Sequence, residues 1–275
     1  VGLQNGVADN LRETLATSTM VTQSVGQLLP PETYSVSHYN YRDPAAAWRG
    51  LNLTLSKQLD TLGAVFVARL LESALKPYGI EEPDAFLHSI GPNIVTARLD
   101  NQSANAIAAN NADSGGSTNS STVTIFEVQD ERVLREFVLK RLGAKPRREQ
   151  IGEAELLISQ SKERGAACFI MGRLMMGPAQ HVRRCLEARM RGETLVAAAD
   201  FQKAARLVEN QTPANTVTYT SDTIPARSFI SAIAAQKAAR EGEPNEAELT
   251  RTLESLSYAV SETRLAEGGF ERVID

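Results

Sequence analysis

Residues 122–143 read TVTIFEVQDERVLREFVLKRLG and predict a strand that leads directly into a helix. In the first seven residues, Val123 and Ile125 face one way while Thr124, Phe126 and Val128 face the other, and the β-branched content favours a strand. Asp130 stands where a helix N-cap belongs, and apolar side chains then recur at helical spacing. Gly143 ends this helix, and Lys140 and Arg141 lie in its last turn, where cations favour the negative end of the helix dipole.

The sequence up to Thr220 continues this pattern of strands and helices. A charged turn, SKERG at residues 161–165, joins two apolar segments and predicts a β-hairpin. Gly177 breaks the second of these strands, and Pro178 is suited to the first turn of a helix that Gly192 closes. The other elements expected here are strands at 155–160, 167–176 and 216–220 and a helix over 195–209.

The order of these elements is βαββαβ, with the second helix doubled. This order matches the ferredoxin-like arrangement, in which two helices cover one face of an antiparallel sheet. We therefore predict an α+β protein with an antiparallel sheet, helices mainly on one face and a central ferredoxin-like unit. Strand pairs that lead into helices recur along the chain and also indicate an internal duplication. The ferredoxin-like fold hosts many functions, so it indicates none by itself.

Three regions are expected, and together they form one compact fragment of a longer protein. Residues 1–121 form an N-terminal α+β region, 122–221 the ferredoxin-like unit, and 222–275 C-terminal helices and a hairpin. The first region ends in a segment, 101–121, of Asn, Ser, Ala and Gly with almost no bulky residue. Such a composition is typical of a disordered loop, and the alternative is a lid over an active site.

Composition and charge argue against several classes of function. The chain has 275 residues, a net charge of −4 and a sequence pI near 5.6. These values argue against a protein that attracts nucleic acid through its overall electrostatic field. Cys168 and Cys185 fall at apolar positions and predict two buried thiols. No CxxC motif or Cys/His cluster accompanies them, and no apolar run reaches the length of a membrane span. We expect no metal, no cofactor and no transmembrane segment.

The sequence contains none of the common catalytic motifs of zinc proteases, serine hydrolases or nucleotide-binding enzymes. Its three histidines, His38, His88 and His181, are far apart and lack metal-ligand spacing. A catalytic pair of His38 with Asp43 is conceivable, but Asp43 followed by proline is better explained as a helix cap. We therefore assign no catalytic residue and favour a protein that is not an enzyme.

Basic side chains form the candidate binding site that we assign from the sequence. If the two central helices lie side by side on the sheet, these side chains meet and can hold an anionic ligand. The alternative is that they are solvated helix faces, as charge runs usually are. The candidates are Lys140, Arg141, Lys145, Arg147, Arg148, Arg183 and Arg184, and Arg189 and Arg191 can join them.

Four short segments of the sequence have a combination of local patterns that can be compared with known proteins. Two of them have a distinctive order: a short helix that ends at Ile90-Gly91 before a strand, and small residues that lead through Ala199-Asp200-Phe201 into a helix. The four are Leu28-Leu29-Pro30 before a strand, FLHSIGPNIVTARL at 86–99, the strand and helix at 123–142, and RGETLVAAADFQKA at 191–204.

As a set, these phrases resemble a broad group of uncharacterised bacterial exported proteins that are catalogued only as a domain of unknown function. The resemblance implies export across the inner membrane, with a signal or anchor outside this sequence, and a periplasmic or cell-surface location. A cytoplasmic location is the alternative. The resemblance implies no known activity and transfers no site residue.

Two functions remain open at this point. The first is a non-enzymatic binding or assembly module of an exported bacterial protein, with a protein or a cell-envelope component as its partner. The second is a hydrolase or transferase with a cleft under the segment 101–121. The missing catalytic motifs favour the first, and the length of that segment favours the second.

Overall fold

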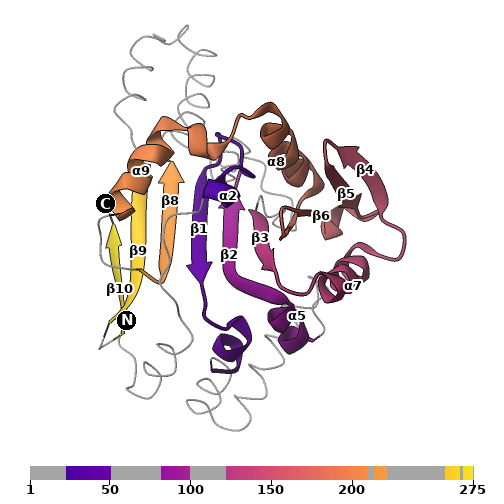
Figure 1. Cartoon of the computed structure of the whole chain (residues 1–275), viewed down its shortest axis with the longest axis horizontal. Coiled ribbons are helices and arrows are strands. Elements are labelled where there is room, and N and C mark those ends of the chain that lie inside the picture. Colours follow the sequence, from indigo (N-terminus) through magenta and orange to yellow (C-terminus); the bar gives the residue numbers. More distant parts are fainter. Residues whose placement is uncertain are drawn as a thin grey trace, which may run out of the picture.

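The computed structural model of the chain describes residues 23–50, 82–99, 122–209, 214–221, 258–266 and 269–274 (Figure 1). The strands within these ranges are β1 (Ser35–Asn40), β2 (Ile90–Arg98), β3 (Thr122–Val128), β4 (Arg147–Ile151), β5 (Ala154–Ile158), β6 (Ala166–Ile170), β7 (Arg173–Gly177), β8 (Thr216–Ser221), β9 (Tyr258–Ala266) and β10 (Gly269–Ile274). They form one sheet in the order β10-β9-β8-β1-β2-β3-β7-β6-β5-β4, and every neighbouring pair is antiparallel.

This sheet confirms the α+β class and its antiparallel character. All three predicted regions contribute to it: β1 and β2 come from the first, β3 to β8 from the second, and β9 and β10 from the third. The final hairpin predicted near the C-terminus is present as β9 and β10. Residues 1–22, the segment 101–121 and residues 222–257, where the C-terminal helices are expected, lie outside the described residues.

Helices cover both faces of the sheet in the described residues, rather than mainly one. The α7 side carries α5 (Pro83–Ser89) and α7 (Glu131–Leu142), and the α8 side carries α2 (Gln23–Gly26), α8 (Ala179–Arg191) and α9 (Ala199–Glu209). Strand alternation explains this division, because Val123 and Ile125 of β3 pack with the α8 side while Phe126 packs with the α7 side. Two apolar cores result, one on each face.

The predicted ferredoxin-like unit is not confirmed, and neither is the internal duplication. In the sheet, β3 pairs with β2 and β7, and β8 pairs with β1 and β9, so β1 and β2 separate the first and last strands of the predicted unit. The apolar run predicted as one strand is the hairpin β6–β7. Strand β4 was not predicted, because its sequence RREQI is polar on both faces and lies at an edge of the sheet.

Local signals at the helix ends are confirmed. The carboxylate of Asp130 accepts a hydrogen bond from the backbone N–H of Val133 at 3.2 Å and caps α7. Gly143, with φ of 96°, ends that helix, and Gly192, in the left-handed conformation at φ of 72°, ends α8. None of the described helices combines the length and apolar character needed to cross a membrane.

Candidate functional site

The structure separates the predicted basic cluster into two groups. Lys140 and Arg141 belong to α7, on one face of the sheet, whereas Arg183 and Arg184 belong to α8, on the opposite face. The two helices do not lie side by side, because the sheet lies between them and each helix packs on a different face of it. The seven basic residues are therefore not brought together.

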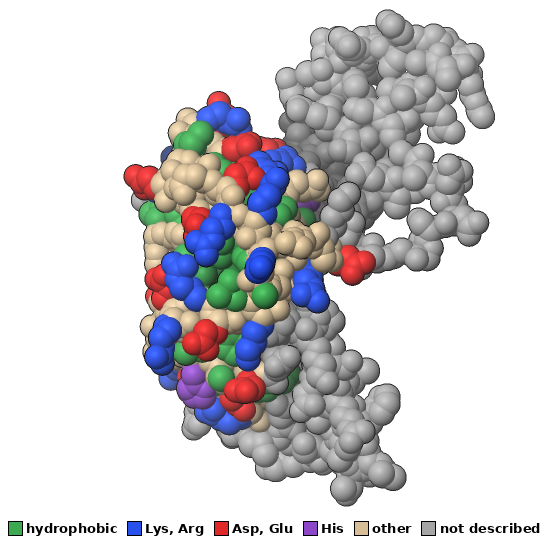
Figure 2. Space-filling model, turned by 90° about the vertical axis from the view of Figure 1, so that its right-hand side faces the viewer, with side chains coloured by type: hydrophobic (Ala, Val, Ile, Leu, Met, Phe, Trp, Pro, Cys, Tyr) green, Lys and Arg blue, Asp and Glu red, His purple; other side chains and the backbone are tan. Residues whose placement is uncertain are grey.

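Most of these cations already contact acceptors within the described residues. Arg183 makes two hydrogen bonds to the Glu149 carboxylate, at 2.9 and 2.7 Å, and these bonds lower the pKa of Glu149 and raise that of Arg183. The other contacts are Arg184 to Glu32 at 2.8 Å, Arg147 to Glu149 at 3.1 Å, Arg148 to Glu155 at 3.2 Å, Arg141 to the carbonyl of Arg164 at 3.3 Å, and Lys140 over the Phe137 ring at 5.9 Å. Accordingly, Figure 2 shows blue and red side chains interspersed on this side of the molecule.

The three histidines lie in three different elements, β1, α5 and α8. His88 is exposed and donates from Nδ1 to the carbonyl of Asp84 at 2.7 Å, while His181 is buried. Asp43 acts as the predicted cap, since its Oδ1 accepts from the N–H of Ala46 at 2.9 Å. Among the described residues, no group of three His, Cys, Asp or Glu side chains can hold a metal ion.

His38 takes part in a polar chain that crosses three neighbouring strands. Its Nε2 lies 3.0 Å from Oδ1 of Asn93 on β2, and Nδ2 of Asn93 donates to Oε2 of Glu127 on β3 at 2.6 Å. Because the amide nitrogen faces the carboxylate, the amide oxygen faces His38, so Nε2 of His38 carries the hydrogen. His38 itself is only 2% exposed.

A break in the register of β2 makes room for this chain. The pairing with β3 shifts between Ile90 and Ile94, where the sequence contains Gly91 and Pro92. Proline cannot donate to the ladder and is accommodated at such irregularities. A Cβ atom on Gly91 would lie 2.8 Å from Cγ of Glu127, so glycine lets Glu127 reach Asn93.

A second polar pair is buried on β9. Glu262 is 1% exposed and contacts Arg264 through Oε2, and Oε1 has no hydrogen-bond partner in the part of the chain that the structure describes. Val217 separates Glu262 from His38 in the register of β9, β8 and β1. The two polar groups therefore lie on the same face of the sheet but do not form one site.

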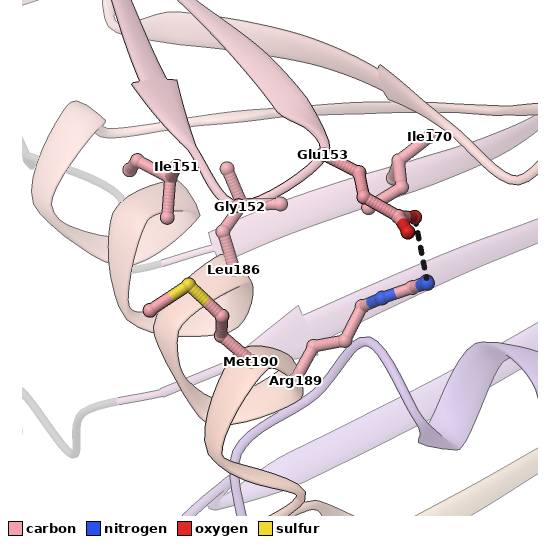
Figure 3. A pocket seen from close by; sticks show the side chains of 7 residues that line it. All are labelled: Ile151, Gly152, Glu153, Ile170, Leu186, Arg189 and Met190. Atoms are coloured by element: carbon pink, nitrogen blue, oxygen red, sulfur yellow. Dashed lines mark ion pairs between the residues drawn. The ribbon is translucent and has the colours of Figure 1, made fainter.

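A small open pocket lies beside the C-terminal end of α8, and we call it the α8 pocket. It has a volume of about 250 Å³. Figure 3 shows its lining side chains converging from the turn between β4 and β5, from β6 and from the last turns of α8. The lining residues are Ile151, Gly152, Glu153, Ile170, Leu186, Arg189 and Met190.

The polar edge of the α8 pocket consists of Arg189 and Glu153. Their closest charged atoms are 3.9 Å apart, and the Glu153 side chain is 92% exposed whereas that of Arg189 is 29% exposed. Nη1 of Arg189 also contacts the sulfur of Met171. The guanidinium therefore sits at the pocket wall with a loose, solvated carboxylate partner.

Two exposed methionines lie in or beside the pocket. Met190 lines it, is 63% exposed and lies against Gly152. Met171 is not a lining residue, but it is 49% exposed, follows Ile170 and contacts the lining residue Arg189. Met171 has a φ of 52° and is the one non-glycine residue with positive φ in the described ranges. A left-handed conformation is unfavourable for such a side chain and is typical of Asn or Gly in two-residue hairpin turns.

Sequence patterns could not locate the α8 pocket, because its residues are separated by up to 39 positions and meet only through β-sheet pairing. The predicted basic set includes Arg189 but not its apolar neighbours Ile151 and Ile170. The Met171-Gly172 dipeptide is a weak turn signal inside an apolar run. Comparison of the chain with protein-family models, with curated proteins and with solved structures gives no match.

Proposed function

We propose that the chain is a non-enzymatic binding module of an exported bacterial protein, and that it docks an apolar side chain of a partner protein in the α8 pocket. The observation that carries the proposal is the exposed Met190 in the pocket lining, together with the exposed Met171 that contacts the lining residue Arg189. Methionine is flexible and polarisable, and it is favoured on surfaces that accept varied apolar partners. The exported location is supported by the sequence resemblance alone.

The conformation of Met171 adds to this proposal. Asn in its place would suit the left-handed turn and stabilise the hairpin by up to about 1 kcal/mol. A residue that costs stability and is exposed beside a pocket is typical of a functional position. We therefore expect Met171→Asn to raise stability and to weaken binding.

The test is a titration of protein carrying ¹³C-methyl methionine, followed by NMR, with the neutral dipeptide acetyl-Leu-Gln-amide as probe. We expect the methyl signals of Met171 and Met190 to shift, whereas that of Met175, fully buried in the sheet, stays in place. Met171→Asn should bind the probe more weakly while unfolding at a higher denaturant concentration. Unchanged Met171 and Met190 signals at millimolar probe would rule the proposal out.

A hydrolase or transferase is the second candidate, and the polar chain His38–Asn93–Glu127 favours it. An imidazole whose tautomer is fixed by a second side chain is the arrangement that holds a general base in many hydrolases. The predicted cleft under 101–121 lies outside the described residues. Hydrolysis of p-nitrophenyl acetate that is lost in His38→Gln but kept in His88→Gln would support this candidate, and equal rates for both variants would remove it.

A further inference from the structure

We propose that the α8 pocket selects an apolar side chain that is followed by an acidic side chain, and that Arg189 binds this carboxylate. The proposal rests on the proposed function, because it names the chemistry of the segment that occupies the same pocket. The partner is thus a protein segment with adjacent apolar and acidic residues.

The volume of the pocket limits what it can hold. At about 250 Å³ it exceeds a cavity of roughly 150 Å³ that holds benzene, but it is smaller than the pockets of roughly 300 to 1,000 Å³ that take drug-sized ligands. Its walls are the apolar side chains of Ile151, Ile170 and Leu186. One large aliphatic side chain therefore fits the space better than a cofactor.

Arg189 has the longest ion pair among the four arginines of α8, within the part of the chain that the structure describes. Its partner there, Glu153, is 3.9 Å away, compared with 2.7 Å for Arg183, 2.8 Å for Arg184 and 3.2 Å for Arg191. Glu153 is 92% exposed, so this pair contributes little, because solvent screens that carboxylate and holding its side chain costs entropy. A ligand can therefore displace Glu153 at low cost.

A ligand carboxylate would offer Arg189 a better partner than it has now. The thioether of Met171 is a weak acceptor, and a carboxylate can accept two hydrogen bonds from one guanidinium. The Arg189 side chain is largely shielded from solvent, so its charge is less screened than that of a fully exposed arginine.

Other charges near the pocket oppose anion binding, which makes the role of Arg189 testable. The chain carries a net charge of −4, and the C-terminal end of α8 is the negative end of its dipole. Glu153 also competes for Arg189. Removing the charge of Glu153 should therefore strengthen the binding of an acidic segment. A variant that merely folds poorly would bind more weakly, so this gain in affinity cannot result from unfolding.

The experiment compares acetyl-Leu-Glu-amide with its neutral isostere acetyl-Leu-Gln-amide on the whole chain, with Met190 methyl shifts as the readout. We expect the acidic dipeptide to bind about five- to tenfold more tightly. Arg189→Gln should abolish this preference while keeping the affinity for the neutral dipeptide, and Glu153→Gln should increase the preference. Arg191→Gln, two residues further along α8, breaks the 3.2 Å pair with Glu193 just beyond the helix and is the matched control, which should leave the preference unchanged.

Each outcome separates the two proposals. If neither dipeptide shifts Met190, the binding function itself is wrong. If both bind with equal affinity, or if Arg189→Gln keeps the preference, only the acidic specificity is wrong. If acetyl-leucine with a free carboxylate binds more tightly than acetyl-Leu-Glu-amide, the pocket recognises a C-terminal carboxylate and not an acidic side chain. That result would overturn the proposal.

Discussion

Asn93 on β2 donates its side-chain amide to Glu127 on β3 at 2.6 Å. The same side chain accepts from His38 on β1 at 3.0 Å, so a single amide joins three strands of the sheet. The bond to Glu127 lies where the pairing of β2 with β3 shifts between Ile90 and Ile94, whereas the pairing of β2 with β1 continues without a shift through Asn93. The bond from Asn93 to Glu127 therefore links β2 and β3 at an interruption of their pairing.

Replacing Asn93 should destabilise the protein. Asn93→Ala leaves the Glu127 carboxylate without its amide donor, and we expect the free energy of unfolding in urea to fall by about 1 to 2 kcal/mol. Asn93→Asp should cost more, because it places two carboxylates within hydrogen-bond distance. Gln129→Ala, at an exposed position just beyond β3, is the control and should stay within about 0.5 kcal/mol of the parent. Equal losses for Asn93→Ala and the control would contradict this role.

Gly165 and Gly172 should respond differently to alanine although their φ values are similar. Both φ values are positive, at 71° and 67°, so either alanine costs roughly 1 to 2 kcal/mol. Gly165 also has a ψ of −142°, a combination that almost only glycine adopts. A Cβ on Gly165 would also lie 2.3 Å from the carbonyl oxygen of Gly177, whereas one on Gly172 meets nothing within 4 Å. We expect Gly165→Ala to lose about 2 to 4 kcal/mol in all and Gly172→Ala about half of that. Thermal and urea unfolding measure both, and similar losses would argue against the close approach to Gly177.

The ion pair of Arg183 with Glu149 should make stability depend on acidic pH. The hydrogen bonds from Arg183 hold the pKa of Glu149 below its ordinary value of 4.5. A lowered folded-state pKa contributes stability above the unfolded value, and this contribution is lost as pH falls through the folded value. Both side chains are about one-third exposed, at 31% and 32%, so the contribution is at most about 1 kcal/mol.

The measurement is urea unfolding of the parent and of Glu149→Gln at pH 7 and at pH 3. We expect the variant to be less stable at pH 7 and to match the parent more closely at pH 3. Glu153→Gln, whose carboxylate is 92% exposed, is the control and should follow the parent at both pH values. A constant difference between parent and Glu149→Gln across this range would contradict the assignment.

The two thiols should be unreactive in the folded protein. Burial raises the pKa of Cys168 to about 11 and that of Cys185 to about 12 from the ordinary value of 9.0. Since the thiolate is the reactive form, Ellman's reagent at pH 8 should label neither cysteine in native protein and two per chain in urea. The raised pKa values also give the buried thiols a contribution to the free energy of unfolding that is fully present below pH 9. This contribution falls as the pH rises above 9, because the thiols ionise first in the unfolded chain. Rapid labelling of native protein would show that these positions are accessible.

Local sequence signals determined several elements of this protein correctly. The strand at β3 followed by α7, the cap at Asp130, and the glycines that end α7 and α8 were all predicted. The burial of both cysteines and the β9–β10 hairpin were predicted as well. These features depend on side-chain periodicity, on capping groups and on residues with special backbone angles, all of which act within a few positions of the chain.

Only the tertiary structure decided which strands are neighbours and which face each helix covers. Alternation assigns the side chains of β3 to two faces, but it does not indicate that β1 and β2 lie between β3 and β8. It also leaves the polar edge strand β4 without a signal. For the same reason, the sequence grouped Lys140 with Arg183, while the sheet places α7 and α8 on opposite faces. The α8 pocket arises from that placement, because antiparallel pairing brings Ile151, Ile170 and Arg189 together from elements that the sequence separates.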